Sequence, residues 1–310
     1  MRTELLDLAE KLKADVYSDG KSFQRAARIL QSYWRISQGY PLDKNARPKA
    51  KEKALGSRLE KKFAVDSLAN YLTPGVRKLV KKTLAEASPD QLFSKPRIYN
   101  DLLSSQPLCF NLFGELRLDL KLATSVFKSL QPSKVKKVTS IQFEYSPERG
   151  SDNFTSDRSA FDVFVEYDNT GGAPCFFGIE VKYHENLKGK AAKHRDRYIE
   201  IAEQMKCFRS GSHAILRKQP LQQLWRDHLL VGVSKQKLGY ADGQFILVYP
   251  GPNTHCRSAV FEYRKHLIDS STFETWTIEE IVSVLRLHTD ATWVEEFYQR
   301  YLKFDLPLAS

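Results

Sequence analysis

The chain has 310 residues, of which 42% are hydrophobic and 12% aromatic, so it can bury a sizeable core and is not a disordered protein. No stretch approaches the roughly 20 apolar residues that span a bilayer, and the first fifteen residues are too charged for a secretory signal. We therefore expect a cytoplasmic protein without a membrane partner. The formal net charge is +11. Residues 1–96 hold 20 Lys and Arg against 11 Asp and Glu, and they carry +9 of this excess.

Apolar residues recur at helical spacing in residues 3–36, 63–84 and 99–122, which predicts mostly helices there. Residues 44–62 carry eight basic residues against two acidic ones, next to Gly39 and Pro41. This basic segment is expected to be a mobile or DNA-facing arm, with Lys49, Lys51 and Lys53 as candidate phosphate contacts. A solubilising helical surface explains the same charge equally well. We expect a basic, mostly helical N-terminal region at 1–96 and a second domain at 97–310.

The hydrophobic period changes from about 3.6 to 2 near residue 138, which indicates strands. In 138–145, Ile141, Phe143 and Tyr145 alternate with polar residues. A second strand is predicted at 160–167, with Phe161 on its apolar side and Asp162 opposite. The turn-forming run DNTGGAP separates it from a third strand at 175–183. Three consecutive strands therefore form a meander.

The remaining pattern alternates again between helix and strand. Helices are predicted from about residue 189 to 208 and over 221–229, and strands over 244–249 and 260–263. Thr277 and Glu280 form a capping-box pattern that begins the C-terminal helices. The order of elements predicts an α/β fold. The four cysteines are far apart and form no C-x-x-C pair, so we expect buried, reduced thiols.

The third strand carries an acid and a base on the same face. Glu180 and Lys182 alternate with the apolar residues around them, and pairing with the second strand can bring Asp162 close to Glu180. Clustered carboxylates repel each other without a cation, so the pair is expected to recruit Mg²⁺, which stabilises charge on a phosphodiester and activates water. Lys182 can orient or deprotonate that water, or neutralise charge in the transition state.

Glu-x-Lys alone is weak evidence for a catalytic site. A second copy at 60–62 lies in the basic segment, with no Asp-bearing strand before it, and is expected to be a solvated helix face. A plain salt bridge on the wet side of a sheet is the ordinary alternative for Glu180 and Lys182. The Asp-bearing strand that precedes Glu180 distinguishes this copy from the one at 60–62.

The order of an Asp-bearing strand, a Glu-x-Lys strand and a helix resembles the restriction-endonuclease-like PD-(D/E)xK superfamily. The run DRSAFDVFVEY followed by FFGIEVKYHENL resembles a family of proposed prokaryotic restriction endonucleases within it. The resemblance implies a core with a central mixed β-sheet flanked by helices. It also implies that Asp162, Glu180 and the Val181 carbonyl bind a metal, with Lys182 as the catalytic lysine. The proline of the motif is absent, since Ala160 and Phe161 precede the aspartate.

Further candidates surround these residues. Glu115, on a predicted helix, and Glu144, on the first strand, are candidate accessory acids, although a solvated position explains Glu144 equally well. The helix after the Glu-x-Lys strand is expected to present one polar face that contacts phosphate or is simply solvated. The candidate nucleic-acid-binding residues outside the basic segment are Arg158, Lys190, Lys193, Arg197 and Gln204.

The sequence therefore predicts an Mg²⁺-dependent endonuclease, with Mn²⁺ as a substitute, acting on DNA in restriction, defence or repair. A non-catalytic nucleic-acid-binding protein on the same fold is one alternative, and a junction-resolving or RNA-cutting nuclease is another. Cutting both strands commonly needs two active sites, so a homodimer is also expected.

Overall fold

The computed structural model describes residues 8–16, 19, 23–44, 54–189 and 191–305. The chain divides into two compact units. The first unit comprises Met1–Ala85, Phe93–Gly114 and Asp290–Ser310, and the second comprises Glu86–Leu92 and Glu115–Thr289. The boundary at residue 96 that the charge distribution suggested stays a prediction.

The first unit is helical in its described part. Glu60 caps α3 (Lys61–Ser67) by accepting the N–H groups of Lys62 and Phe63, so this copy of Glu-x-Lys starts a helix. Arg300 is fully buried, with its guanidinium 4.0 Å from the Trp34 ring centroid. The labelled helices of this unit are α2 (Phe23–Ser37), α3 (Lys61–Ser67), α4 (Pro74–Ala85), α5 (Arg97–Asn100), most of α6 (Ser105–Leu118) and α13 (Thr292–Tyr301).

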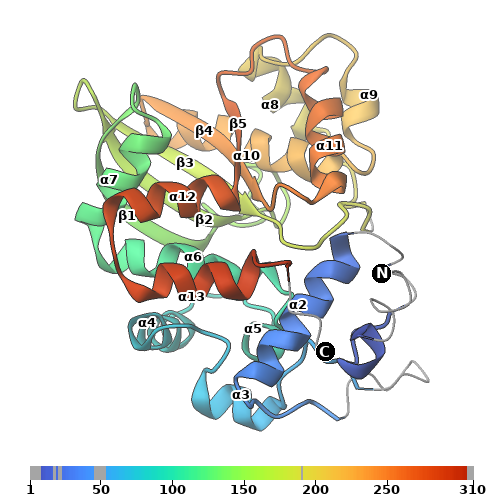
Figure 1. Ribbon diagram of the computed structural model, residues 1–310. Helices are drawn as coiled ribbons and strands as arrows, with labels where there is room; N and C mark the ends of the chain where they lie inside the picture. Colours follow the sequence, from blue (N-terminus) through green and yellow to red (C-terminus); the bar gives the residue numbers. More distant parts are fainter. Residues whose placement is uncertain (1–7, 17–18, 20–22, 45–53, 190, 306–310) are drawn as a thin grey trace. The chain divides into compact units, whose positions relative to one another are not determined.

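The second unit contains one five-stranded sheet in the order β1-β2-β3-β4-β5 (Figure 1). The β1–β2 and β2–β3 pairs are antiparallel, whereas the β3–β4 and β4–β5 pairs are parallel. This mixed sheet confirms the fold that the resemblance implied. The strands are β1 (Val135–Tyr145), β2 (Phe161–Asn169), β3 (Pro174–Val181), β4 (Asp242–Tyr249) and β5 (Phe273–Thr277).

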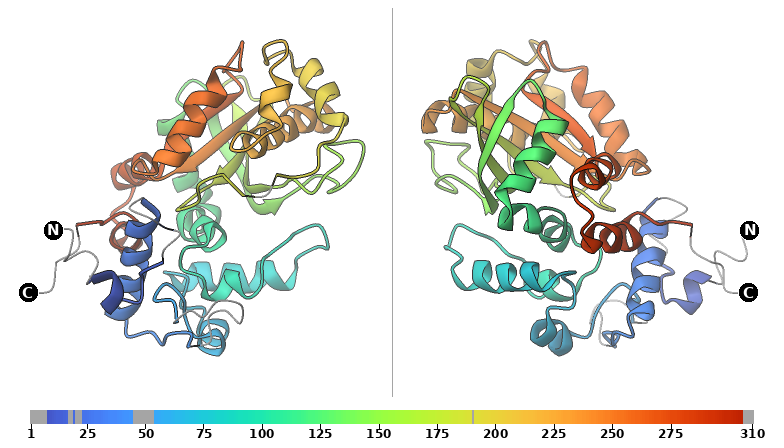
Figure 2. Two further views of the ribbon diagram at one scale, coloured as in Figure 1. Left: turned by 90° about the vertical axis from the view of Figure 1, so that its right-hand side faces the viewer. Right: turned by 60° about the vertical axis from the view of Figure 1, so that its left-hand side comes forward.

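Helices cover both faces of the sheet (Figures 1 and 2). On one face, Phe127 of α7 (Leu120–Leu130) stacks on Phe177 of β3, and α12 (Ile278–His288) packs beside α7. On the other face, α8 (Arg197–Met205), α10 (Gln222–Leu238) and α11 (Thr254–Arg264) share one apolar core with the strands. The short helix α9 spans His213–Leu216. Sheets with parallel strands need this cover on both faces.

Local sequence signals explain several element boundaries. The predicted capping box is confirmed at the start of α12, where the Thr277 hydroxyl accepts the Glu280 N–H and the Glu280 carboxylate accepts the Thr277 N–H. All four cysteines are buried free thiols, as predicted. Among the described residues, no helix combines the length and the apolar character that crossing a bilayer requires.

Some predicted elements are wrong. The described residues between β3 and α8 form no helix, so the helix expected from residue 189 begins later, at Arg197. Residues 260–263 belong to α11 and are not a strand, because their apolar residues follow a helical period in the longer segment. The expected helix at 99–122 is divided among α5, α6 and α7, and β5 was not predicted.

Two aromatic residues also face the side opposite to the one predicted. Glu144 has φ +50°, an uncommon conformation for a residue with a side chain, and it turns the end of β1. Tyr145 therefore leaves the row of Phe143 and stacks on Phe164 with ring centroids 4.2 Å apart. Its strand partner Phe161 lies on the same face, over Gly178.

Candidate active site

The candidate site lies where β2 begins and β3 ends. The ladder pairs Val163 with Ile179, and continuing this register by one residue sets Asp162 opposite Glu180. At that point the Val181 N–H donates to Oδ2 of Asp162 at 2.9 Å. A side-chain carboxylate thus takes the place of a ladder carbonyl, which fixes Asp162 at the junction of the two strands.

Glu180 is held by two donors from different elements. Its Oε1 atom accepts hydrogen bonds from Nζ of Lys182 at 2.5 Å and from Nε2 of Gln223, on α10, at 2.7 Å. Glu180 and Lys182 are only 5% and 8% exposed, so the pair lies inside the protein and not on a wet sheet face. A surface salt bridge, the ordinary alternative, does not describe this environment.

The site contains more acidic than basic groups. Burial, and next the Glu180 charge, raise the pKa of Asp162 well above its usual range. Burial alone would lower the pKa of Lys182, but Glu180, Glu185 and Asp162 outweigh it and raise that pKa, so the lysine stays charged. The structure therefore brings together two carboxylates and an ammonium, as the strand alternation predicted.

The two carboxylates are suited to a divalent cation. Within the described part of the chain, Oδ1 of Asp162 and Oε2 of Glu180 have no hydrogen-bond partner, while the other oxygen of each is anchored. Among those same residues, no group of three or more His, Cys, Asp or Glu side chains could hold a metal ion. Mg²⁺ is ordinarily held by only one or two carboxylates, with water and phosphate oxygens completing its shell, so the donor set fits this ion.

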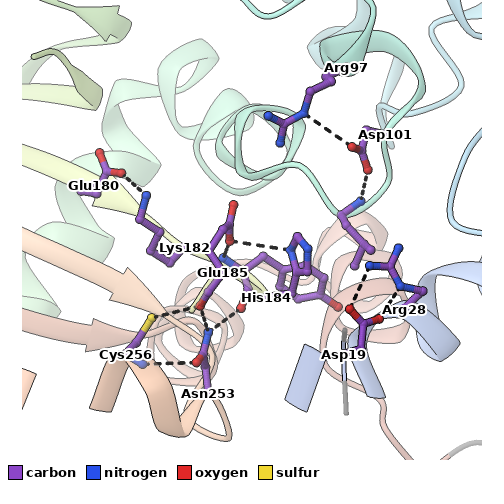
Figure 3. A network of polar contacts seen from close by, with 12 residues as sticks. Asp19, Arg28, Arg97, Asp101, Glu180, Lys182, His184, Glu185, Asn253 and Cys256 are labelled. Atoms are coloured by element: carbon purple, nitrogen blue, oxygen red, sulfur yellow. Dashed lines mark hydrogen bonds and ion pairs between the residues drawn. The ribbon is translucent and has the colours of Figure 1, made fainter. Parts of the chain in front are cut away.

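The chain directly after β3 is fixed by Asn253 (Figure 3). Its Nδ2 donates to the carbonyls of Tyr183 and Glu185 at 2.9 and 3.1 Å, and its Oδ1 accepts the Cys256 N–H at the start of α11. Burial acts to raise the pKa of Glu185, but His184, Lys182 and the Tyr183 N–H together lower it. Glu185 is thus a further charged acid close to Lys182, and the strand pattern did not predict it.

A partly buried ion pair, also not predicted, supports the start of β2. Nε of Arg226, on α10, donates to Oδ2 of Asp157 at 2.6 Å, and Nη2 donates to the Ser159 hydroxyl at 2.8 Å. Burial opposes ionisation of Asp157, but Arg226 and the hydroxyl of Tyr198 lower its pKa. Ser159 precedes Asp162 by three residues, so this ion pair holds in place the chain that leads into β2.

One signal in the sequence indicates that the helix α10 contributes to the site. Polar residues interrupt an otherwise apolar run, and Gln223 and Asp227 are spaced by four, which sets them on one side of a helix. Asp227 is 3% exposed, and burial followed by the Glu180 charge raises its pKa well above the usual range. The prediction of this helix rested on its apolar residues alone and assigned no role to the polar ones.

The two candidate accessory acids differ in their surroundings. Glu144 is one of the charges that raise the pKa of Asp162, and its Oε1 is held by Nη2 of Arg149 at 2.8 Å. Glu115 is half-buried on α6. The roles of both acids stay predictions.

The candidate nucleic-acid contacts do not form one helical face. Lys193 is exposed in the irregular segment before α8, so the predicted face is wrong because the helix starts at Arg197. Arg197 bonds Glu200 and the Phe154 carbonyl, whereas Gln204 and Arg158 are exposed. The other candidates, Lys49, Lys51, Lys53 and Lys190, lie outside the described residues.

Comparisons with known proteins identify the family of the chain. A model of the PD-(D/E)XK nuclease superfamily matches residues 18–303. Searches of curated proteins and of solved structures gave no match. The family match extends over most of the chain and over both compact units, and the mixed sheet with its helical layers is consistent with the family's fold. The chain belongs to the PD-(D/E)XK nuclease superfamily.

Proposed function

We propose that this protein is a metal-dependent endonuclease that hydrolyses phosphodiester bonds in DNA, with Mg²⁺ as its ion and Mn²⁺ as a substitute. The observation that carries the proposal is the arrangement of Asp162 and Glu180. Each presents one anchored carboxylate oxygen and one that no described residue bonds, beside the Lys182 ammonium. The proposal includes a cytoplasmic role in restriction, defence or repair, and a two-fold dimer for cutting both strands.

Three groups would hold the ion. The unbonded oxygens of Asp162 and Glu180 are two of them, and the Val181 carbonyl is the third. The N–H and C=O groups of one strand residue point to the same strand edge, and the Val181 N–H is directed at Asp162. This supports a Val181 carbonyl on the Asp162 side. When bound, Mg²⁺ supplies charge stabilisation for the phosphate and lowers the pKa of water.

Lys182 acts on the reacting water and phosphate. Its ammonium has three donors, and one of them is engaged with Glu180. The remaining N–H groups can orient the attacking water and neutralise charge that develops on the phosphate in the transition state. Because Glu180 holds Nζ in place, these donors are oriented before the substrate arrives.

A cleavage assay with matched variants tests the proposal. The wild type should cut DNA when Mg²⁺ or Mn²⁺ is added, and Asp162→Asn and Lys182→Ala should each lower the rate by about 10²-fold or more. Asp168→Asn on β2 and Lys137→Ala on β1 are the controls, because they change the same residue types at the far end of these strands. Plasmid, linear duplex, single-stranded DNA, four-way junctions and RNA would be compared.

Thermal unfolding distinguishes the proposed metal ligand Asp162 from Lys182, which does not bind the metal in this proposal. Mg²⁺ should raise the melting temperature of the wild type and of Lys182→Ala by mass action, but not that of Asp162→Asn. Wild-type cleavage rates in both variants would refute the assignment. Metal-independent DNA binding without any cleavage would favour a non-catalytic binding protein, and preference for a junction or RNA would change the substrate class.

A further inference from the structure

Gln223 is a polar residue that contacts the candidate active site and lies outside the motif of Asp162, Glu180 and Lys182. It is half-buried near the start of α10, and its amide Nε2 donates to Oε1 of Glu180 at 2.7 Å. A carboxylate can only accept, so the amide must present its nitrogen and not its oxygen to Glu180. This fixes the orientation of the Gln223 side chain.

The beginning of α10 is itself held in place on both sides of Gln223. The Gln222 amide forms two hydrogen bonds with the backbone of Ala192, accepting the N–H at 2.7 Å and donating to the carbonyl at 2.8 Å. One turn later, Arg226 bonds Asp157 and Ser159. α10 also packs directly against β3 and β4. Gln223 therefore approaches Glu180 from a helix whose position is fixed independently of Glu180.

The consequence lies in which oxygen of Glu180 is used. Gln223 and Lys182 both donate to Oε1, so two donors from different elements determine the carboxylate's rotamer. Among the described residues, Oε2 has no partner. If only Lys182 held the carboxylate, its plane could rotate about the terminal torsion, because that torsion is broad. Gln223 limits this rotation.

We propose that Gln223 is a positioning residue that holds Glu180 so that its second oxygen is directed to a divalent cation. This inference rests on the proposed function, in which Glu180 binds that cation. Groups that orient metal ligands typically change metal affinity by about 10- to 100-fold when they are removed. Gln223 does not touch the cation in this proposal, and it acts only through Glu180.

Calorimetric titration of the metal-free protein with Mg²⁺ tests the proposal. Gln223→Met keeps the length of the side chain but removes the donor, and it should raise the Kd for Mg²⁺ by about 10- to 100-fold. Gln223→Ala should have a similar effect, and it provides a second variant if methionine disturbs folding. Gln236→Ala is the matched control, since Gln236 is an exposed glutamine on the same helix, and it should keep the wild-type Kd.

Two readouts distinguish positioning from a structural role. In cleavage assays, Gln223→Met should raise the Mg²⁺ concentration needed for half-maximal rate, while kcat at saturating Mg²⁺ largely recovers. A structural role would instead lower the melting temperature of the metal-free protein without changing the Kd for Mg²⁺, and that result would overturn the inference. A wild-type protein that binds no Mg²⁺ would instead overturn the proposed function.

Discussion

Asp227 is a buried acid without a hydrogen-bond partner for its Oδ2 atom among the described residues. It lies on α10 one turn after Gln223, and Glu180 is the nearby charge that most raises its pKa after burial. The charged form of a carboxyl group in this position favours the unfolded chain, because unfolding returns the group to water. Asp227 thus belongs to the charge balance of the site without being one of its proposed ligands.

The pH dependence of stability follows from this pKa shift. An acid whose pKa is higher in the folded than in the unfolded state binds more protons when folded, so its unfavourable effect develops as the pH rises above about 4. Asp227→Asn should therefore increase the free energy of unfolding of the metal-free protein at pH 7, by about 1 kcal/mol or more. Below pH 4 this gain should disappear. Urea unfolding between pH 4 and pH 8 measures it, and an equal difference at every pH would contradict the explanation.

Gly178 shows how the β2–β3 hairpin requires a residue without a side chain. A Cβ atom at Gly178 would lie 2.5 to 2.9 Å from ring atoms of Phe161, which is closer than side-chain carbons approach. Phe161 directly precedes Asp162, and Gly178 lies two residues before Glu180. The close contact of ring and strand therefore forms part of the support beneath both proposed metal ligands.

Gly178→Ala should lower the free energy of unfolding by about 1–3 kcal/mol, because the Phe161 ring or the strand must move. Gly171→Ala, in the turn of the same hairpin, is the control. Its Cβ would meet only the Asn169 side chain at 3.4 Å, and it has the same effect on the unfolded chain. Chemical denaturation of both variants gives the comparison. Equal stabilities would show that the ring adjusts without cost.

The strand alternation predicted the main part of the sheet and the meeting of Asp162 with Glu180, because both depend only on local periodicity and on a hairpin. The face of Tyr145 could not be predicted, since the positive φ of Glu144 breaks the alternation of β1 without a glycine to signal it. Phe161 on β2 pairs with Tyr145 and lies on the same face. Gln223 also lay beyond prediction. It meets Glu180 only through the packing of α10, from 43 residues further along the chain.

The basic segment, residues 44–62, is the strongest charge feature of the whole chain. If it follows the phosphate backbone, changing Lys49, Lys51 and Lys53 together to alanine should weaken DNA binding uniformly across sequences. The slope of log affinity against log salt should also fall by about 0.9 for each phosphate that a lysine no longer neutralises. Binding would be measured without metal, so that no cleavage intervenes.

Removal of three other exposed lysines is the matched control for this charge change. Lys128, Lys136 and Lys137 lie on α7 and β1 and are exposed. Their replacement alters the net charge equally, and it should leave the salt slope near that of the wild type. Equal slopes in both triple variants would assign the basic segment a solubilising role.

The mixed order of the sheet has a consequence for the course of folding. β2 and β3 are joined by a short turn, and such hairpins form within about 1–10 μs. β4 pairs with β3 only after a loop of about 60 residues between them has closed, which is slower. Asp162, Glu180 and Lys182 thus lie in or next to the β2–β3 hairpin, whose contacts are local in sequence. Gln223 lies on α10, in the long connection between β3 and β4. We expect the charged cluster to assemble early and its supporting helix to dock late. The mutual repulsion of the two acids then acts on the folding chain before α10 is in place.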